Sequence, residues 1–274
     1  MISSKKYLNY LGIFLLSIYA FWINWFSANV GVMAIDTFAF FDTGFSILKN
    51  KIPIRDYWIF TGIVVDYFQA LFFLIFGESW RSYIFHASFL NIIASLTFYF
   101  FLLRLNLNKV YSFLYSLSFA TLCYPVSGTP FAYIHSFIFS LISIFLLCIA
   151  IKEKNNFLWF LIPITSFFAF FSMQTPSFYI ILIIIIFSLH FFLIEKNFDS
   201  FKNFVIGVIF TIIFLFLYIF LSKTSINDFL YQYFLFPLTI GEGRLASDPS
   251  AYVSLGDQLN FKRLIGEFKF IHIF

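Results

Sequence analysis

The sequence predicts an all-α, polytopic membrane protein. Hydrophobic residues make up 61% of the 274 residues and charged residues only 11%, whereas an average soluble domain has about 25% charged residues. The apolar runs are long and continuous, which favours membrane-spanning helices over barrel strands. A soluble fold of this size could not bury so much apolar surface. The net charge of +4 is modest and gives no indication of a nucleic-acid partner.

The apolar runs predict a transmembrane bundle of about seven spans, each close to the about 17 to 25 residues that a membrane helix needs. The first run follows Lys5 and Lys6 and is too long for the apolar region of a signal peptide, which has about 7 to 15 residues. We therefore expect an uncleaved helix with a cytoplasmic amino end. The predicted spans are 8–29, 82–103, 109–124, 132–151, 157–173, 177–194 and 203–222.

Segment 60–77 is also apolar and could either cross the membrane or lie on its surface. The charges of the short loops indicate which of the two it does. Loops 104–109, 152–156 and 195–203 each carry two basic residues, whereas the alternate loops carry none. Basic short loops belong in the cytoplasm, and a crossing at 60–77 would place all three outside. We therefore expect 60–77 to lie on the outer face as an amphipathic or re-entrant helix, with Asp66 at the interface.

This membrane topology predicts one membrane domain, 1–274, in three parts. A first external loop, 30–81, carries the interfacial helix, and a helical bundle follows over 82–222. An external segment, 223–274, ends in the apolar run LIGEFKFIHIF, which looks like the approach to a further span. Cys123 and Cys148 are expected to be small apolar core residues, and no Cys/His metal spacing is present.

Polar residues gather at the predicted outer ends of the helices, which indicates an outward-facing polar cleft. Each has a simpler alternative. A lone histidine at a helix end is often an interfacial group, Asp36 could cap a surface helix, Arg55 beside Asp56 predicts a local salt bridge, and Gln174 precedes a Thr-Pro turn. The candidates are Asp36, Asp42, Arg55, Asp56, His86, His135, Gln174, Glu242 and Arg244.

Three consecutive stretches together resemble a known family. They are AIDTFAFFDTGFSILKNKIPIRDYW, the helix ending LFFLIFGESW, and RSYIFHASFLNIIASLTFYFFLLRL. This order is similar to the start of GT-C-type membrane glycosyltransferases, the broad group around glycosyltransferase family 39 and the dolichyl-phosphate-mannose-protein mannosyltransferases. Those proteins begin with one helix and a large external loop that has an acidic residue near its start. The resemblance covers about 1–200 in topology and is most specific over 34–104.

The resemblance implies transfer of a sugar from a polyprenyl-phosphate donor to a lipid, glycan or protein acceptor at the outer face of a bacterial inner membrane. It implies Asp36 as general base, with Asp42 in reserve. Arg244 would hold the lipid phosphate, with Arg55 and Arg81 as weaker candidates. Some branches of the family bind a divalent metal through such an aspartate. The remaining candidates would line the substrate cleft: Asp56, His86, His135, Gln174 and Glu242.

The sequence also departs from the family pattern. Thr37 follows Asp36 where a paired Asp-Glu would stand, and family members generally carry more helices, so we expect a truncated member. Two other functions stay open. One is a transporter or flippase of a lipid-linked sugar, although no inverted repeat is evident. The other is a non-catalytic membrane component of envelope assembly, because fold analogy alone does not establish activity.

Overall fold

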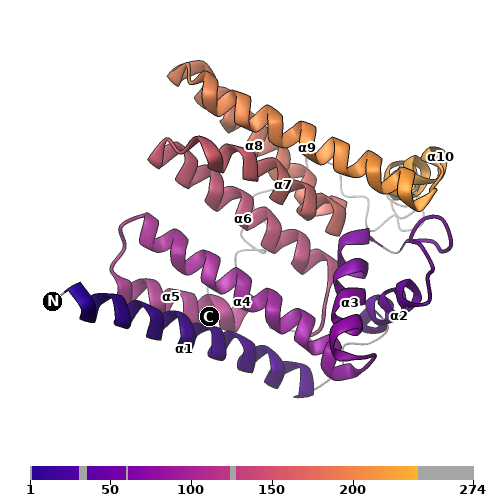
Figure 1. Cartoon of the computed structure of the whole chain (residues 1–274), viewed down its shortest axis with the longest axis horizontal. Coiled ribbons are helices and arrows are strands. Elements are labelled where there is room, and N and C mark those ends of the chain that lie inside the picture. Colours follow the sequence, from indigo (N-terminus) through magenta and orange to yellow (C-terminus); the bar gives the residue numbers. More distant parts are fainter. Residues whose placement is uncertain (1, 31–35, 60, 124–127, 240–274) are drawn as a thin grey trace, which may run out of the picture. The chain divides into compact units, whose positions relative to one another are not determined.

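The computed structural model describes the chain except for residues 1, 31–35, 60, 124–127 and 240–274, and except for the side chains of residues 2–9, 36 and 37. The described part is all-α, with ten α-helices and one isolated bridge between Pro53 and Tyr57 (Figure 1). The helices are α1 (Ile2–Val30), α2 (Asp36–Leu48), α3 (Ile63–Phe76), α4 (Trp80–Arg104), α5 (Lys109–Cys123), α6 (Ala132–Glu153), α7 (Asn156–Ser172), α8 (Gln174–Glu195), α9 (Phe198–Ser222) and α10 (Ile226–Leu230).

The chain forms two compact units, residues 1–224 and 225–274. The first unit contains α1 to α9. The described part of the second unit contains α10 and a π-helical turn, Tyr231–Leu235, in which the rings of Phe229 and Tyr233 stack with centroids 5.5 Å apart. The expectation of a single membrane domain stays a prediction.

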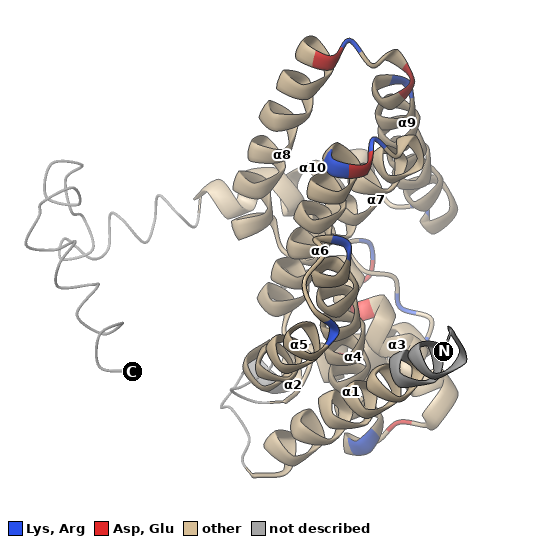
Figure 2. Ribbon diagram, turned by 90° about the vertical axis from the view of Figure 1, so that its left-hand side faces the viewer, with Lys and Arg blue, Asp and Glu red and all other residues tan. Residues whose placement is uncertain are grey.

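Five helices in the described part of the chain are long and apolar enough to cross a membrane: Tyr10–Val30 of α1, and α4, α6, α8 and α9. The chain is therefore an integral membrane protein with several helical spans, as its composition predicts. Figure 2 shows charged residues mostly at helix ends and turns. Two of the seven predicted spans are shorter. At about 1.5 Å per residue, the 15 residues of α5 and the 17 residues of α7 rise less than the hydrocarbon thickness of about 30 Å.

The three basic loops lie at one end of the first unit. The Lys152 ammonium donates to the Arg104 carbonyl oxygen at 2.6 Å, and Arg104 pairs with Glu153 at 2.6 Å. Lys154 pairs with Glu195 at 2.7 Å. The amino end of α1 lies at this end, and α2 and α3 lie at the other (Figure 1). The alternation of basic and neutral loops therefore corresponds to the two ends of the helices, while the side that faces the cytoplasm stays a prediction.

Helix α3 forms within the segment predicted as interfacial. It has 14 residues, a rise of about 21 Å, which is too short to span the hydrocarbon layer. It follows Gly62 and ends at Gly77, whose φ of 82° suits glycine. Asp66, which we expected at the membrane interface, is only 3% exposed, because α3 turns this face towards other helices of the protein. Its depth in the membrane stays a prediction.

Of the two cysteines expected in the core, Cys123 packs against the cluster of Ala87, Leu90, Ala94 and Ile138, whereas Cys148 does not lie in the core. Cys123 is half-buried, whereas Cys148 is exposed, because α6 turns Leu147 and Ala150 into the core instead. Both thiols are free.

Close contacts depend on glycine at several described positions, two of which meet the backbone of α7. A Cβ at Gly207 of α9 would lie 2.5 Å from the Phe160 carbonyl oxygen and 3.1 Å from Pro163, both on α7. A Cβ at Gly62, just before α3, would collide with the backbone carbonyls of Phe171 and Ser172 at the end of α7. Small residues at such contacts let helix backbones approach closely in membranes.

We expect Gly207→Ala to destabilise the protein by about 1 to 3 kcal/mol, because the added methyl group meets backbone atoms of α7 that cannot move aside. The matched control is Gly12→Ala in α1, where a Cβ meets only ordinary contacts at 3.8 and 3.9 Å. Alanine should be neutral there, or stabilising by up to about 1 kcal/mol. The measurement is thermal unfolding in detergent. Equal stability of the two variants would contradict the close α7–α9 contact.

Candidate functional site

The buried carboxylate of Asp66 is the centre of a polar cluster at the end of the first unit that holds α2 and α3. The Thr43 hydroxyl of α2 donates to Asp66 Oδ1 at 2.7 Å, and the Tyr57 hydroxyl donates to Oδ2 at 3.4 Å. Burial raises the pKa of Asp66 to about 7, against the opposing effect of these two hydrogen bonds. A carboxyl group that titrates near neutrality can exchange protons under physiological conditions.

Tyrosines enclose this carboxylate. Burial raises the pKa of Tyr57, so its hydroxyl remains a protonated donor to Asp66. Tyr67 follows Asp66 directly, and its ring meets the Tyr218 ring of α9 edge to face, with centroids 5.9 Å apart. Tyr218 also donates to the Pro53 carbonyl at 3.4 Å. The cluster therefore joins α2, α3, α9 and the loop between α2 and α3.

That loop is anchored by Arg55 and Asp56. The Arg55 guanidinium donates to both carboxylate oxygens of Asp56, at 2.9 and 2.7 Å, and to the Ser222 carbonyl at the end of α9, at 2.9 Å. The hydrogen bond from Arg55, followed by the one from the Ile52 amide, lowers the pKa of Asp56 to about 2. The predicted local salt bridge is thus confirmed. A binding role for either residue stays a prediction.

An apolar pocket adjoins the tyrosines of the cluster. It lies between α3, α7 and α9, has a volume of about 350 Å³, and is called the α3–α7–α9 pocket below. This volume falls at the lower end of the range of small-molecule sites. Tyr67 and Tyr218 contribute the hydroxyl groups of its wall. The lining residues are Ile63, Val64, Tyr67, Phe68, Phe167, Phe168, Phe214, Leu215 and Tyr218.

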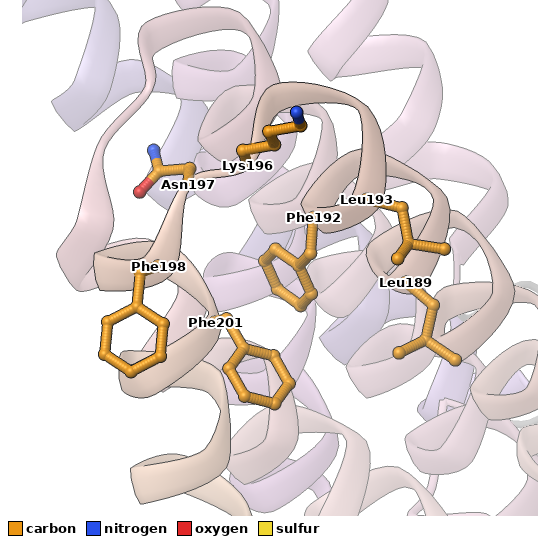
Figure 3. A pocket seen from close by; sticks show the side chains of 7 residues that line it. All are labelled: Leu189, Phe192, Leu193, Lys196, Asn197, Phe198 and Phe201. Carbon is orange, nitrogen blue, oxygen red and sulfur yellow. The ribbon is translucent and has the colours of Figure 1, made fainter.

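A second hollow, of about 280 Å³, lies at the turn between α8 and α9. Figure 3 shows Phe192, Phe198 and Phe201 around it, with the Lys196 ammonium turned away from these rings. It belongs to the end of the unit with the basic turns, and its lining contains no carboxylate or histidine. The α3–α7–α9 pocket is therefore the better candidate for a functional site.

His86 and His135, predicted separately, come together in the structure. Their Nε2 atoms lie 2.9 Å apart, and the side chains are 2% and 0% exposed. They are buried between α4 and α6, and their expected contact with substrate stays a prediction. Gln174 is partly buried at the start of α8, next to a cis peptide bond between Thr175 and Pro176.

The remaining candidate residues are either exposed, or their side chains or whole residues are not described. Helix α2 begins at Asp36, whose side chain is not described. Asp42, on the same helix, is exposed and makes no hydrogen bond or ion pair with another described residue. Arg81 is exposed at the start of α4. Glu242 and Arg244 lie outside the described residues.

Sequence reasoning missed the Asp66 cluster. An aspartate within a 14-residue apolar helix is a signal in itself, because an ionisable group in such a setting needs a partner. The partner, Thr43, stands 23 positions earlier, and nothing in the sequence marks it. Across the part of the chain that the structure describes, no group of three or more His, Cys, Asp or Glu side chains could hold a metal ion.

Comparison with protein-family models, with curated proteins and with solved structures gives no match. The chain is a polytopic helical membrane protein with several apolar spans, and its resemblance to GT-C-type glycosyltransferases stays a prediction.

Ionisation of Asp66 should make stability depend on pH. Because the folded pKa of about 7 lies above the ordinary aspartate value of 3.8, stability is greatest below the lower value and is lost as the pH rises through about 7. We expect a loss of roughly 2 to 3 kcal/mol between about pH 5 and about pH 8. Asp66→Asn should remove this loss, since the amide stays neutral and can still accept from Thr43.

The measurement is the free energy of unfolding in detergent at several pH values. The control is Asp42→Asn, which removes an exposed carboxylate and should leave the pH dependence as in the wild type. A wild-type pH profile retained in Asp66→Asn would show that another group causes it.

Proposed function

We propose that this chain is a membrane glycosyltransferase that moves a sugar from a polyprenyl-phosphate donor to an acceptor at the outer face of the membrane. The resemblance over 34–104 suggests the reaction. The observation that supports it best is the apolar α3–α7–α9 pocket beside a buried carboxylate that titrates near neutrality. A lipid-linked donor needs an apolar surface for its chain, which the pocket offers, and the carboxylate beside it holds α2, the helix that begins at Asp36.

The chemistry requires one base and one phosphate-binding cation. A sugar on a phosphate already has a good leaving group, so a carboxylate that accepts the proton of the acceptor hydroxyl, and a fixed cation at the departing phosphate, are sufficient. In this proposal Asp36 is the base, with Asp42 in reserve, and Arg244 binds the phosphate. Arg55 is the weaker cation, because Asp56 already neutralises it through two hydrogen bonds.

Asp66 acts in this proposal as a positioning residue. Its hydrogen bond from Thr43 ties α3 to α2, the helix that begins at Asp36. Loss of this bond would free α2 to shift, and a base that is misplaced by about 1 Å can lose about 100-fold in rate. The buried carboxylate therefore supports the reaction without contact with the substrate.

A transporter of a lipid-linked sugar is the second candidate, and the buried histidine pair favours it. Ionisable residues inside membrane helices are typical of proton relays in transporters, and His86 and His135 lie on two of the candidate spans. A transporter would move the lipid-linked sugar across the membrane without cleaving its phosphate bond.

The full chain in liposomes, supplied with a set of polyprenyl-phosphate hexoses and mixed acceptors, should release free polyprenyl phosphate. Asp36→Asn should lower this rate by about 100-fold or more, while Asp199→Asn, an exposed acidic residue at the basic end, should keep it. Movement of the intact donor across the bilayer without phosphate release would favour the transporter. If neither phosphate release nor movement of the donor is detected, the result would favour a non-catalytic role.

Filling the α3–α7–α9 pocket should weaken donor binding selectively. Leu215→Trp places an indole among the lining rings, so KM for the lipid donor should rise about tenfold, which corresponds to about 1.4 kcal/mol. The control is Leu217→Trp on the exposed face of the same helix, where the side chain is 51% exposed. An unchanged KM in a folded Leu215→Trp protein would exclude the pocket as the site of the donor chain.

A further inference from the structure

A chain of hydrogen-bonding groups links three helices next to the Asp66 cluster. His135 Nδ1 lies 2.8 Å from the Phe131 carbonyl oxygen, and His135 Nε2 lies 2.9 Å from His86 Nε2. His86 Nδ1 lies 2.9 Å from Gln69 Oε1 of α3. All three side chains are buried, with exposed fractions of 2% or less. The Phe72 ring stacks on His86, with centroids 5.2 Å apart.

The groups at the two ends of this hydrogen-bonded series determine how many protons the two histidines hold. A carbonyl oxygen only accepts, so His135 Nδ1 must carry hydrogen towards Phe131. With Gln69 Oε1 facing His86, Nδ1 of His86 must carry hydrogen as well. Both Nε2 lone pairs then face each other at 2.9 Å, an arrangement that repels unless a proton lies between them. This arrangement places three protons on four nitrogens and gives the pair one positive charge.

The neutral pair needs the opposite orientation of the Gln69 amide. His86 then donates from Nε2 to His135, its Nδ1 is bare, and Gln69 must present its amide nitrogen as donor. Amide oxygen and nitrogen have nearly the same size, so reversal needs no extra space. Gln69 Nε2 has no hydrogen-bond partner among the described residues, so reversal breaks no other described bond.

We propose that His86 and His135 form a binding site for a single proton, and that the Gln69 amide reverses as the proton enters or leaves. The distance favours a proton over a metal ion. Two imidazole nitrogens on a tetrahedral zinc ion, with bonds of about 2.0 to 2.1 Å, lie about 3.3 Å apart, and these two are closer.

Among the described residues, few other ionisable groups face the pair. Asp66 lies three residues before Gln69 on the same buried face of α3, so its ionised form favours uptake of the proton. On α4, Tyr83 is buried one turn before His86 and interacts with the Pro130 carbonyl. On α6, Tyr133 is exposed and the other ionisable residues begin 13 positions after His135, at Cys148. Helix α7, described throughout, contains no ionisable side chain.

The test is nitrogen NMR of the full chain in lipid nanodiscs, labelled with ¹⁵N-histidine, in a background with His190→Gln and His272→Gln. The histidine signals then come from His86 and His135 alone. Between about pH 4 and about pH 9, we expect one transition that takes up one proton, from two protonated ring nitrogens to three. Two separate transitions, no transition, or a metal retained at one equivalent would each overturn the proposal.

Gln69→Glu tests the role of the amide. A glutamate carboxylate can only accept, and its charge favours the protonated pair, so the transition should move up by about 1 to 3 pH units. Asn203→Asp, which adds the same charge at the start of α9, should leave the transition where it is. An unmoved transition in folded Gln69→Glu would exclude Gln69 as the coupled partner, while the wild-type titration tests the proton site independently of this variant.

Discussion

The docking of α3 is the constraint on which the candidate site depends. This helix is too short to cross a bilayer and meets the rest of the unit through polar side chains as well as apolar ones. Its start lies so close to the end of α7 that only glycine fits at position 62, because any Cβ would collide with the carbonyls of Phe171 and Ser172. With the start of α3 fixed there, Asp66 meets Thr43 of α2, and Gln69 meets His86 of α4.

Directional hydrogen bonds specify the packing of the other helices in the same way. Apolar contacts alone discriminate weakly between helix arrangements in lipid, since lipid tails are as apolar as the side chains. Asn91 of α4 donates to the carbonyls of Ala20 and Ala120, which ties α1, α4 and α5 together. Asn24 of α1 donates to Ser88 and to the Gly128 carbonyl. Each amide can satisfy its donors only in one rotation of its helix.

The two ends of the first unit have different characters. One end carries the basic turns, held by ion pairs between exposed side chains that contribute little to stability. The other end carries α2, α3 and the loop anchored by Arg55, where carboxylates, tyrosine hydroxyls and an apolar pocket meet. The proposed reaction of a lipid-linked donor would use this combination, and the proposed proton site would add a group that responds to pH beside it.

The sequence by itself determined the all-α membrane class, the positions of the long helices and the grouping of the basic loops. These properties follow from local composition, because length and hydropathy decide which segments can enter a bilayer. The pairing of Arg55 with Asp56 could also be predicted from the sequence, since the two residues are neighbours. Only the tertiary structure decided that Asp66 is buried against Thr43 and that His86 meets His135, 49 positions away. Such contacts depend on which helices pack together and on the rotation of each helix about its axis, and neither property is encoded in any single segment.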